Sequence, residues 1–162
     1  MPFTPGFSKT VTKRIQTLDG KCDELRWMLD FLTPGWLTRE LIPAMRRLKS
    51  PFSIAHMGMF RAGDAGFEDF VSFLKDANGW PKLTGLYRIS TAPGYADLAA
   101  NMRAVVEAAP ERALWGSDYP HLSFADKAST GVLFQKFTGW IADENQRQKI
   151  LVDNPARCFG FA

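Results

Sequence analysis

The feature that most constrains the fold is a short apolar segment that recurs about every 30 residues. Four such segments occur, at residues 26–32, 52–56, 82–87 and 113–117. Each one is too short for a helix, and a stretch with helical spacing follows it. A spacing of roughly 30 residues is typical of a βα unit, and right-handed crossovers make successive strands parallel. The sequence therefore predicts an α/β fold with about four parallel strands.

Four βα units allow two closures, an open doubly wound sheet or half of a (β/α)₈ barrel, which needs about 250 residues. Composition does not choose between them. Helices are expected at 37–48, 67–74, 94–106, 130–142 and 143–152. Asp64 is expected to cap the second helix, and Asn154-Pro155 to end the last. Residues 1–25 lack a clean period, which predicts an irregular segment, or one poorly formed helix at 11–18, ahead of a domain at 26–162.

Composition narrows the class of protein. The chain has 162 residues, of which 46% are hydrophobic and 23% charged, and this is typical of one globular domain. Its net charge of +3 comes without a long basic run, so nucleic-acid binding is not expected. There is no apolar run of membrane-spanning length, so no membrane partner is expected. Cys22 and Cys158 are far apart, which predicts reduced thiols in a cytoplasmic protein.

Titratable side chains follow two of the predicted strands. Asp118 and His121 come after the strand at 113–117, and His56 ends the strand at 52–56. Parallel strands place their carboxyl ends at one edge of a sheet, where α/β enzymes carry their chemistry. An ordinary structural role is the alternative, since an Asp after a strand often caps or turns the chain and a lone His is often part of the core. Alternation places His56 on the face of Phe52 and Ile54.

Four motifs together resemble a known family, the amidohydrolase-related (amidohydrolase 2) hydrolases, and within it the branch that contains pyrone dicarboxylate lactonase. The motifs are Ile54-Ala55-His56-Met57-Gly58, Lys82-Leu83-Thr84-Gly85-Leu86-Tyr87-Arg88, Glu111-Arg112-Ala113-Leu114-Trp115-Gly116-Ser117-Asp118-Tyr119-Pro120-His121 and Leu151-Val152-Asp153-Asn154-Pro155-Ala156-Arg157. The resemblance implies a TIM barrel of which this chain carries the second half.

The resemblance also implies roles for single residues. Asp118 matches the aspartate that activates water, and His56 matches a histidine that polarises the substrate or binds a metal. Arg88 and His121 match positions that hold an anionic substrate. Tyr87 is a further candidate for substrate binding, with packing as the alternative. If a divalent metal such as Zn binds, His56 and Asp118 would be its ligands, whereas the lactonase branch needs none.

One element of the family pattern is absent from these 162 residues, the His-x-His of the first barrel strand. Two functions therefore remain open. The first is hydrolysis of a lactone or a related carboxylated small molecule by aspartate-activated water. The second is a truncated or degenerate half-barrel without independent catalysis that serves as a binding or assembly module. Alternation predicts that Phe52, Ile54, Leu114 and Gly116 form an open inward face, so a homo-oligomer is expected.

Overall fold

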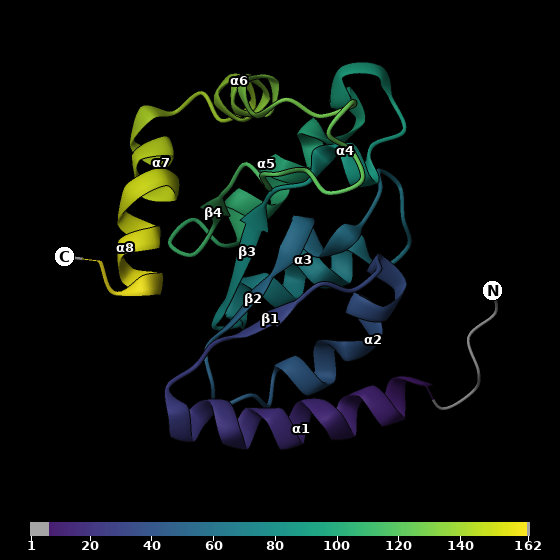
Figure 1. Cartoon of the computed structure of the whole chain (residues 1–162), viewed down its shortest axis with the longest axis vertical. Coiled ribbons are helices and arrows are strands. Elements are labelled where there is room, and N and C mark those ends of the chain that lie inside the picture. Colours follow the sequence, from purple (N-terminus) through teal and green to yellow (C-terminus); the bar gives the residue numbers. More distant parts are fainter. Residues whose placement is uncertain (1–6, 162) are drawn as a thin grey trace.

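A computed structural model describes residues 7–161 of the chain. Its centre is a parallel four-stranded sheet with the order β1-β2-β3-β4, which confirms the predicted direction and order of the strands (Figure 1). The strands are β1 (Leu29–Phe31), β2 (Phe52–Ile54), β3 (Gly79–Leu83) and β4 (Leu114–Trp115). All four are shorter than the sequence pattern predicts, and β3 starts and ends earlier.

The early end of β3 changes where two site residues lie. The prediction of a strand through Tyr87 is wrong, because Gly85 adopts a left-handed conformation with φ 62° and starts helix α4 (Leu86–Ile89). Glycine takes this conformation without the steric cost that a side chain brings. Tyr87 and Arg88 therefore lie on one helical turn after β3, rather than on opposite faces of a strand.

The two faces of the sheet differ in polarity. Phe31 pairs with Ile54 in register, and both belong to the hydrophobic core, as does Phe52, whose ring stacks on Phe73 of α3 (Phe67–Asp76) at 6.3 Å. Phe52 and Ile54 therefore face the helices, so the prediction that they point inward is wrong. The opposite face instead carries a polar row.

Helices α2 (Gly35–Met45), α3 and α5 (Ala99–Ala108) lie side by side over the apolar face of the sheet (Figure 1). The helical elements after β2 also include η1 (Ala55–Met59), η2 (Pro93–Leu98), α6 (Thr130–Trp140), α7 (Glu144–Gln148), η3 (Lys149–Asp153) and α8 (Asn154–Phe159). Between residues 7 and 161, no helix is long and apolar enough to cross a membrane.

The expectation of an irregular N-terminal segment is wrong for the described part of it. Residues Phe7–Leu25 form α1, a helix of 19 residues, while residues 1–6 lie outside the described range. Ile15 and Cys22, two helical turns apart, are buried on one face of α1. The Asp19 carboxylate accepts a hydrogen bond from the backbone N–H of Ser50 at 2.9 Å, which fixes α1 to the chain just before β2.

Two predicted helix ends also differ from the structure. Asp64 does not cap α3, since Gly66 precedes the helix and the Asp64 carboxylate accepts the backbone N–H of Arg61 at 2.8 Å. Asn154-Pro155 does not end the last helical stretch, because Pro155 lies in the first turn of α8. The first turn of a helix tolerates proline, since its backbone N–H groups have no helical partner there.

Candidate active site

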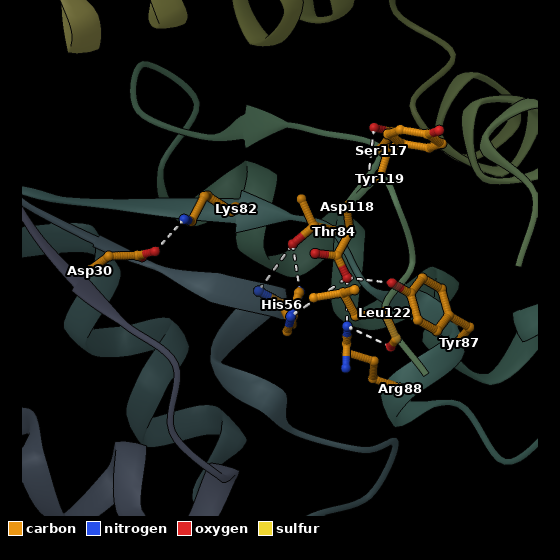
Figure 2. A network of polar contacts seen from close by, with 10 residues as sticks. All are labelled: Asp30, His56, Lys82, Thr84, Tyr87, Arg88, Ser117, Asp118, Tyr119 and Leu122. Carbon is orange, nitrogen blue, oxygen red and sulfur yellow. Dashed lines mark hydrogen bonds and ion pairs between the residues drawn. The ribbon is translucent and has the colours of Figure 1, made fainter. Parts of the chain in front are cut away.

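Three segments bring polar side chains together at the carboxyl ends of β2, β3 and β4 (Figure 2). His56 follows β2, Tyr87 and Arg88 follow β3, and Asp118 follows β4. The structure thus gathers four of the five predicted site residues at the edge of the sheet where parallel α/β folds place their chemistry.

Asp118 is the centre of this group. One of its carboxylate oxygens, Oδ2, accepts hydrogen bonds from the Tyr87 hydroxyl and, at 3.0 Å, from Nε of Arg88. Tyr87 and Arg88 are consecutive residues of α4, so their side chains point about 100° apart around the helix and not in opposite directions as on a strand. Both side chains can therefore reach the same oxygen. The Arg88 guanidinium also lies over the Tyr87 and Phe124 rings, 5.2 Å from each centroid. These contacts fix the orientation of the carboxylate.

His56 approaches the same carboxylate from β2. Its backbone is left-handed, with φ 52°, so the side chain leaves the face that alternation from Phe52 and Ile54 predicts. The ring packs against Gly85, where a Cβ atom would lie 2.3 Å from Nδ1. Its Nε2 atom lies 3.8 Å from Oδ2 of Asp118. A short-range electrostatic contact therefore links the two groups without a direct hydrogen bond.

Thr84 is a site residue that the sequence analysis missed. Its Oγ1 lies 2.7 Å from Nδ1 of His56 and accepts the backbone N–H of His56 at 3.2 Å. The sequence analysis placed Thr84 inside the strand predicted at 82–87 and proposed no role for it. Its position immediately before Gly85, at the end of an apolar segment, is the signal that could have pointed to it.

The polar row on the inward face of the sheet continues the site. Lys82 of β3 forms an ion pair with Asp30 of β1 at 2.8 Å, and Ser53 of β2 donates to the other Asp30 oxygen, also at 2.8 Å. A cleft of about 270 Å³ joins this row to the catalytic candidates. Its lining consists of Asp30, Leu32, Ala55, His56, Lys82, Thr84 and Asp118. The cleft therefore carries charged side chains, whereas the sequence predicted an apolar inward face.

The surroundings shift the protonation of both central groups. Burial lowers the pKa of His56 below its ordinary value, and the charges of Arg88 and Lys82 lower it further, although Asp118 acts in the opposite direction. Burial by itself raises the pKa of Asp118, but the hydrogen bonds from Tyr87 and Arg88 outweigh it, so the net shift is downward. At neutral pH the site therefore combines a neutral imidazole with a carboxylate anion.

His121 does not join this hydrogen-bonded network. It lies in the loop after β4 and is 95% buried, and its Nε2 lies 3.1 Å from the Thr130 hydroxyl of α6. Its ring meets the Tyr87 ring edge-on, with 5.5 Å between centroids. Nδ1 of His121 is buried without a hydrogen-bond partner among the described residues. A role for His121 in substrate binding stays a prediction.

Comparisons with known proteins identify the family of this chain. A family model described as Amidohydrolase matches residues 4–161. The chain belongs to the amidohydrolase family. It is 33% identical over 147 residues to a 4-sulfomuconolactone hydrolase of Hydrogenophaga intermedia, which covers 86% of this chain and 48% of the relative. The chain thus spans about half the length of the curated relatives that it matches.

Solved structures of this amidohydrolase family share the fold. A protein from Agrobacterium tumefaciens, solved in its apo form, superimposes with a TM-score of 0.80 at 27% identity, over 91% of this chain and 56% of that one. An amidohydrolase from Burkholderia multivorans with bound zinc gives a TM-score of 0.70 at 16% identity, over 98% of this chain and 58% of that one. These neighbours are TIM barrels, so the four units correspond to half a barrel and not to a doubly wound sheet.

The zinc-bound neighbour raises the question of a metal, which the described residues of this amidohydrolase do not fit well. His56 and Asp118 lie close together, but the described residues contain no group of three His, Cys, Asp or Glu side chains that could hold a metal ion. A catalytic zinc site typically uses three protein ligands. The Arg88 guanidinium also lies 3.0 Å from the Asp118 oxygen that would bind the ion, and its charge would repel a cation.

Proposed function

We propose that this amidohydrolase hydrolyses a lactone with an acidic substituent, using water activated by Asp118. The observation that carries this proposal is the Asp118 carboxylate, held beside a neutral His56 and a cationic Arg88 at the carboxyl ends of three parallel strands. A base that activates water and a hydrogen-bond donor to the carbonyl oxygen are the groups that ester hydrolysis uses, and a cation beside them can bind an acidic substituent. Relatives named as lactone hydrolases support the choice of substrate class.

The reaction assigns one task to each group. Asp118 takes a proton from a water molecule as the water oxygen bonds to the carbonyl carbon of the lactone. His56 donates a hydrogen bond to the carbonyl oxygen, on which negative charge develops. The ring C–O bond then breaks, and the leaving oxygen receives the proton from Asp118. The product is the open hydroxy acid, and the carboxylate of Asp118 is restored.

Arg88 is proposed to bind the acidic substituent of the substrate while its Nε holds the Asp118 carboxylate. Nε of its guanidinium is bonded to Asp118, and Nη2 donates to the backbone carbonyl of Leu122 at 3.5 Å. The Nη1 group can therefore meet a carboxylate or sulfonate. A second hollow, of about 370 Å³, is lined by both Arg88 and Arg61. Asp64 lines the same hollow, so two arginines against one aspartate leave it net positive. A positive hollow favours an acidic substituent, as the name of the 4-sulfomuconolactone hydrolase relative indicates for that protein.

The proposal is tested by assaying lactones with and without acidic substituents. Asp118→Asn is expected to lower kcat by about 10²–10⁴-fold, because an amide cannot take the proton from water. Asp69→Asn, on an exposed ion pair of α3 with Arg39, is the matched control and should retain activity. Full activity of Asp118→Asn would refute the assignment of the base. Binding of acidic lactones without turnover would favour the alternative, a binding module.

We also propose that a second copy of the chain completes the barrel. Among the described residues β1 and β4 are edge strands. Exposed apolar side chains lie next to both, with Trp27 and Leu32 (63% and 62% exposed) beside β1, and Leu122 after β4. A two-fold axis along the strands would set β4 of each copy beside β1 of the other, giving eight parallel strands and no open edge. Exposed edges and apolar patches favour such pairing.

Sedimentation over a range of concentrations tests this assembly. The expected species is a dimer, and Leu32→Lys should shift it toward the monomer, because the change places a charge at the proposed seam. Val132→Lys, at an exposed position of α6, is the control and should leave the dimer unchanged. A folded monomer at every concentration would refute the proposal.

A further inference from the structure

Thr84 holds His56 at two points. Its Oγ1 accepts the backbone N–H of His56 at 3.2 Å and lies 2.7 Å from Nδ1 of the ring (Figure 2). Both residues are buried, with 9% of Thr84 and 4% of His56 exposed. A hydroxyl group that follows β3 therefore fixes both the backbone and the ring of a residue that follows β2.

The position of the proton in this contact follows from the donors available. A threonine hydroxyl has one hydrogen to donate and two lone pairs to accept with. If Nδ1 of His56 donated to Thr84, the hydroxyl would accept twice, and its own hydrogen would find no further acceptor among the described residues. If the hydroxyl donates to Nδ1 instead, all three groups are satisfied. Buried polar groups strongly favour the second arrangement.

The opposite ring nitrogen points to the same answer. Nε2 of His56 lies 3.8 Å from Oδ2 of Asp118. A lone pair on Nε2 would face a negative oxygen, whereas an N–H there turns its positive end toward that oxygen. The 3.8 Å separation exceeds a direct hydrogen bond, so this N–H is still available to a ligand. The contacts at both nitrogens thus favour a single tautomer.

We propose that Thr84 is a positioning residue, which holds neutral His56 in the tautomer that carries its hydrogen on Nε2. The inference deepens the proposed function and takes its catalytic meaning from it. With the hydrogen on Nε2, His56 donates to the carbonyl oxygen of the lactone and cannot accept the proton of water at that atom. The division of tasks with Asp118 as the base is therefore set by a hydroxyl group that need not touch the substrate.

The tautomer can be measured by ¹H–¹⁵N long-range NMR correlations of the imidazole rings, at a pH where they are neutral. The chain has two histidines, so a spectrum of His56→Gln assigns the signals. In the unmodified protein, Nδ1 of His56 should show the shift of an unprotonated nitrogen and Nε2 that of a protonated one. The opposite pattern would overturn the proposal, whether or not the protein hydrolyses a lactone.

Two variants separate the hydroxyl group from the shape of the side chain. Thr84→Ser keeps the donor and should retain the single tautomer. Thr84→Val has nearly the same shape without the hydroxyl, and should give a mixture of tautomers. With an acidic lactone as substrate, Thr84→Val should also lower kcat about tenfold with little change in KM, since a wrong tautomer impairs the chemical step. A single Nε2–H tautomer in a folded Thr84→Val would refute the role of Thr84.

Discussion

Nε2 of His56 lies 3.8 Å from Oδ2 of Asp118, although the two residues follow β2 and β4, which are not neighbours in the sheet. The intervening strand β3 ends at Leu83, and Gly85 follows it. Gly85 has no side chain, so the His56 ring can occupy the space beside it and approach Asp118. The contact between the proposed donor and the proposed base thus depends on one glycine between them.

Substitution of that glycine gives the first prediction. Gly85→Ala places a Cβ atom 2.3 Å from Nδ1 of His56 and a side chain at φ 62°. The combined clash and strain should cost about 1–3 kcal/mol in the free energy of unfolding and displace the His56 ring. Gly20→Ala is the control, since Gly20 lies inside α1 with no atom within 4 Å of the added Cβ. Urea denaturation should show Gly20→Ala unchanged or more stable.

The second prediction concerns acid pH. Burial lowers the pKa of His56 below its ordinary value of 6.5, so the unfolded chain takes up a proton at a higher pH than the folded chain. The unfolded state then binds more protons, and the free energy of unfolding should fall as the pH drops below about 6.5. His56→Gln should weaken this dependence. Denaturation at several pH values checks it, and an NMR titration midpoint of His56 above 6.5 would contradict it.

The third prediction concerns alkaline pH. Burial and the hydrogen bond to Asp118 raise the pKa of Tyr87 to about 12. An absorbance titration should therefore show a tyrosine that ionises near pH 12, and Tyr87→Phe should remove this late step. Tyr119→Phe, at a position 78% exposed, is the control. Because the folded pKa is raised, the stability that Tyr87 contributes is present below pH 10 and decreases above it. A late step that persists in Tyr87→Phe would contradict the assignment.

The strand periodicity was sufficient to predict the parallel sheet, but side-chain directions at the strand ends were not accessible to it. Alternation holds only while the backbone stays extended. His56 has a positive φ of 52°, so its side chain leaves the face that counting from Phe52 predicts. Non-glycine residues seldom adopt this conformation, and tertiary contacts maintain it where they do.

Thr84 and α1 show two further limits of sequence analysis. Thr84 is recognised only by its distance to a ring that follows another strand, and no local pattern encodes that distance. Helix α1 has a Gly at position 20 and few regularly spaced apolar residues, so its helical pattern is weak. Packing of Ile15 and Cys22 and the contact of Asp19 with Ser50 stabilise it, and these are tertiary interactions.

The fourth prediction concerns the support of β4, which leads to Asp118. Asn154 of α8 is completely buried, and its amide donates to the backbone carbonyls of Pro110 at 3.0 Å and Ala113 at 2.8 Å. Asn154→Ala would leave the buried carbonyl of Ala113 without this donor, at a cost of about 1–3 kcal/mol in the free energy of unfolding, whereas the carbonyl of Pro110 also accepts from the Gln146 side chain at 3.2 Å. Asn145→Ala, at an exposed position in α7, is the control. Urea denaturation of both variants is the measurement. Equal stability of the two would show that α8 does not anchor the start of β4.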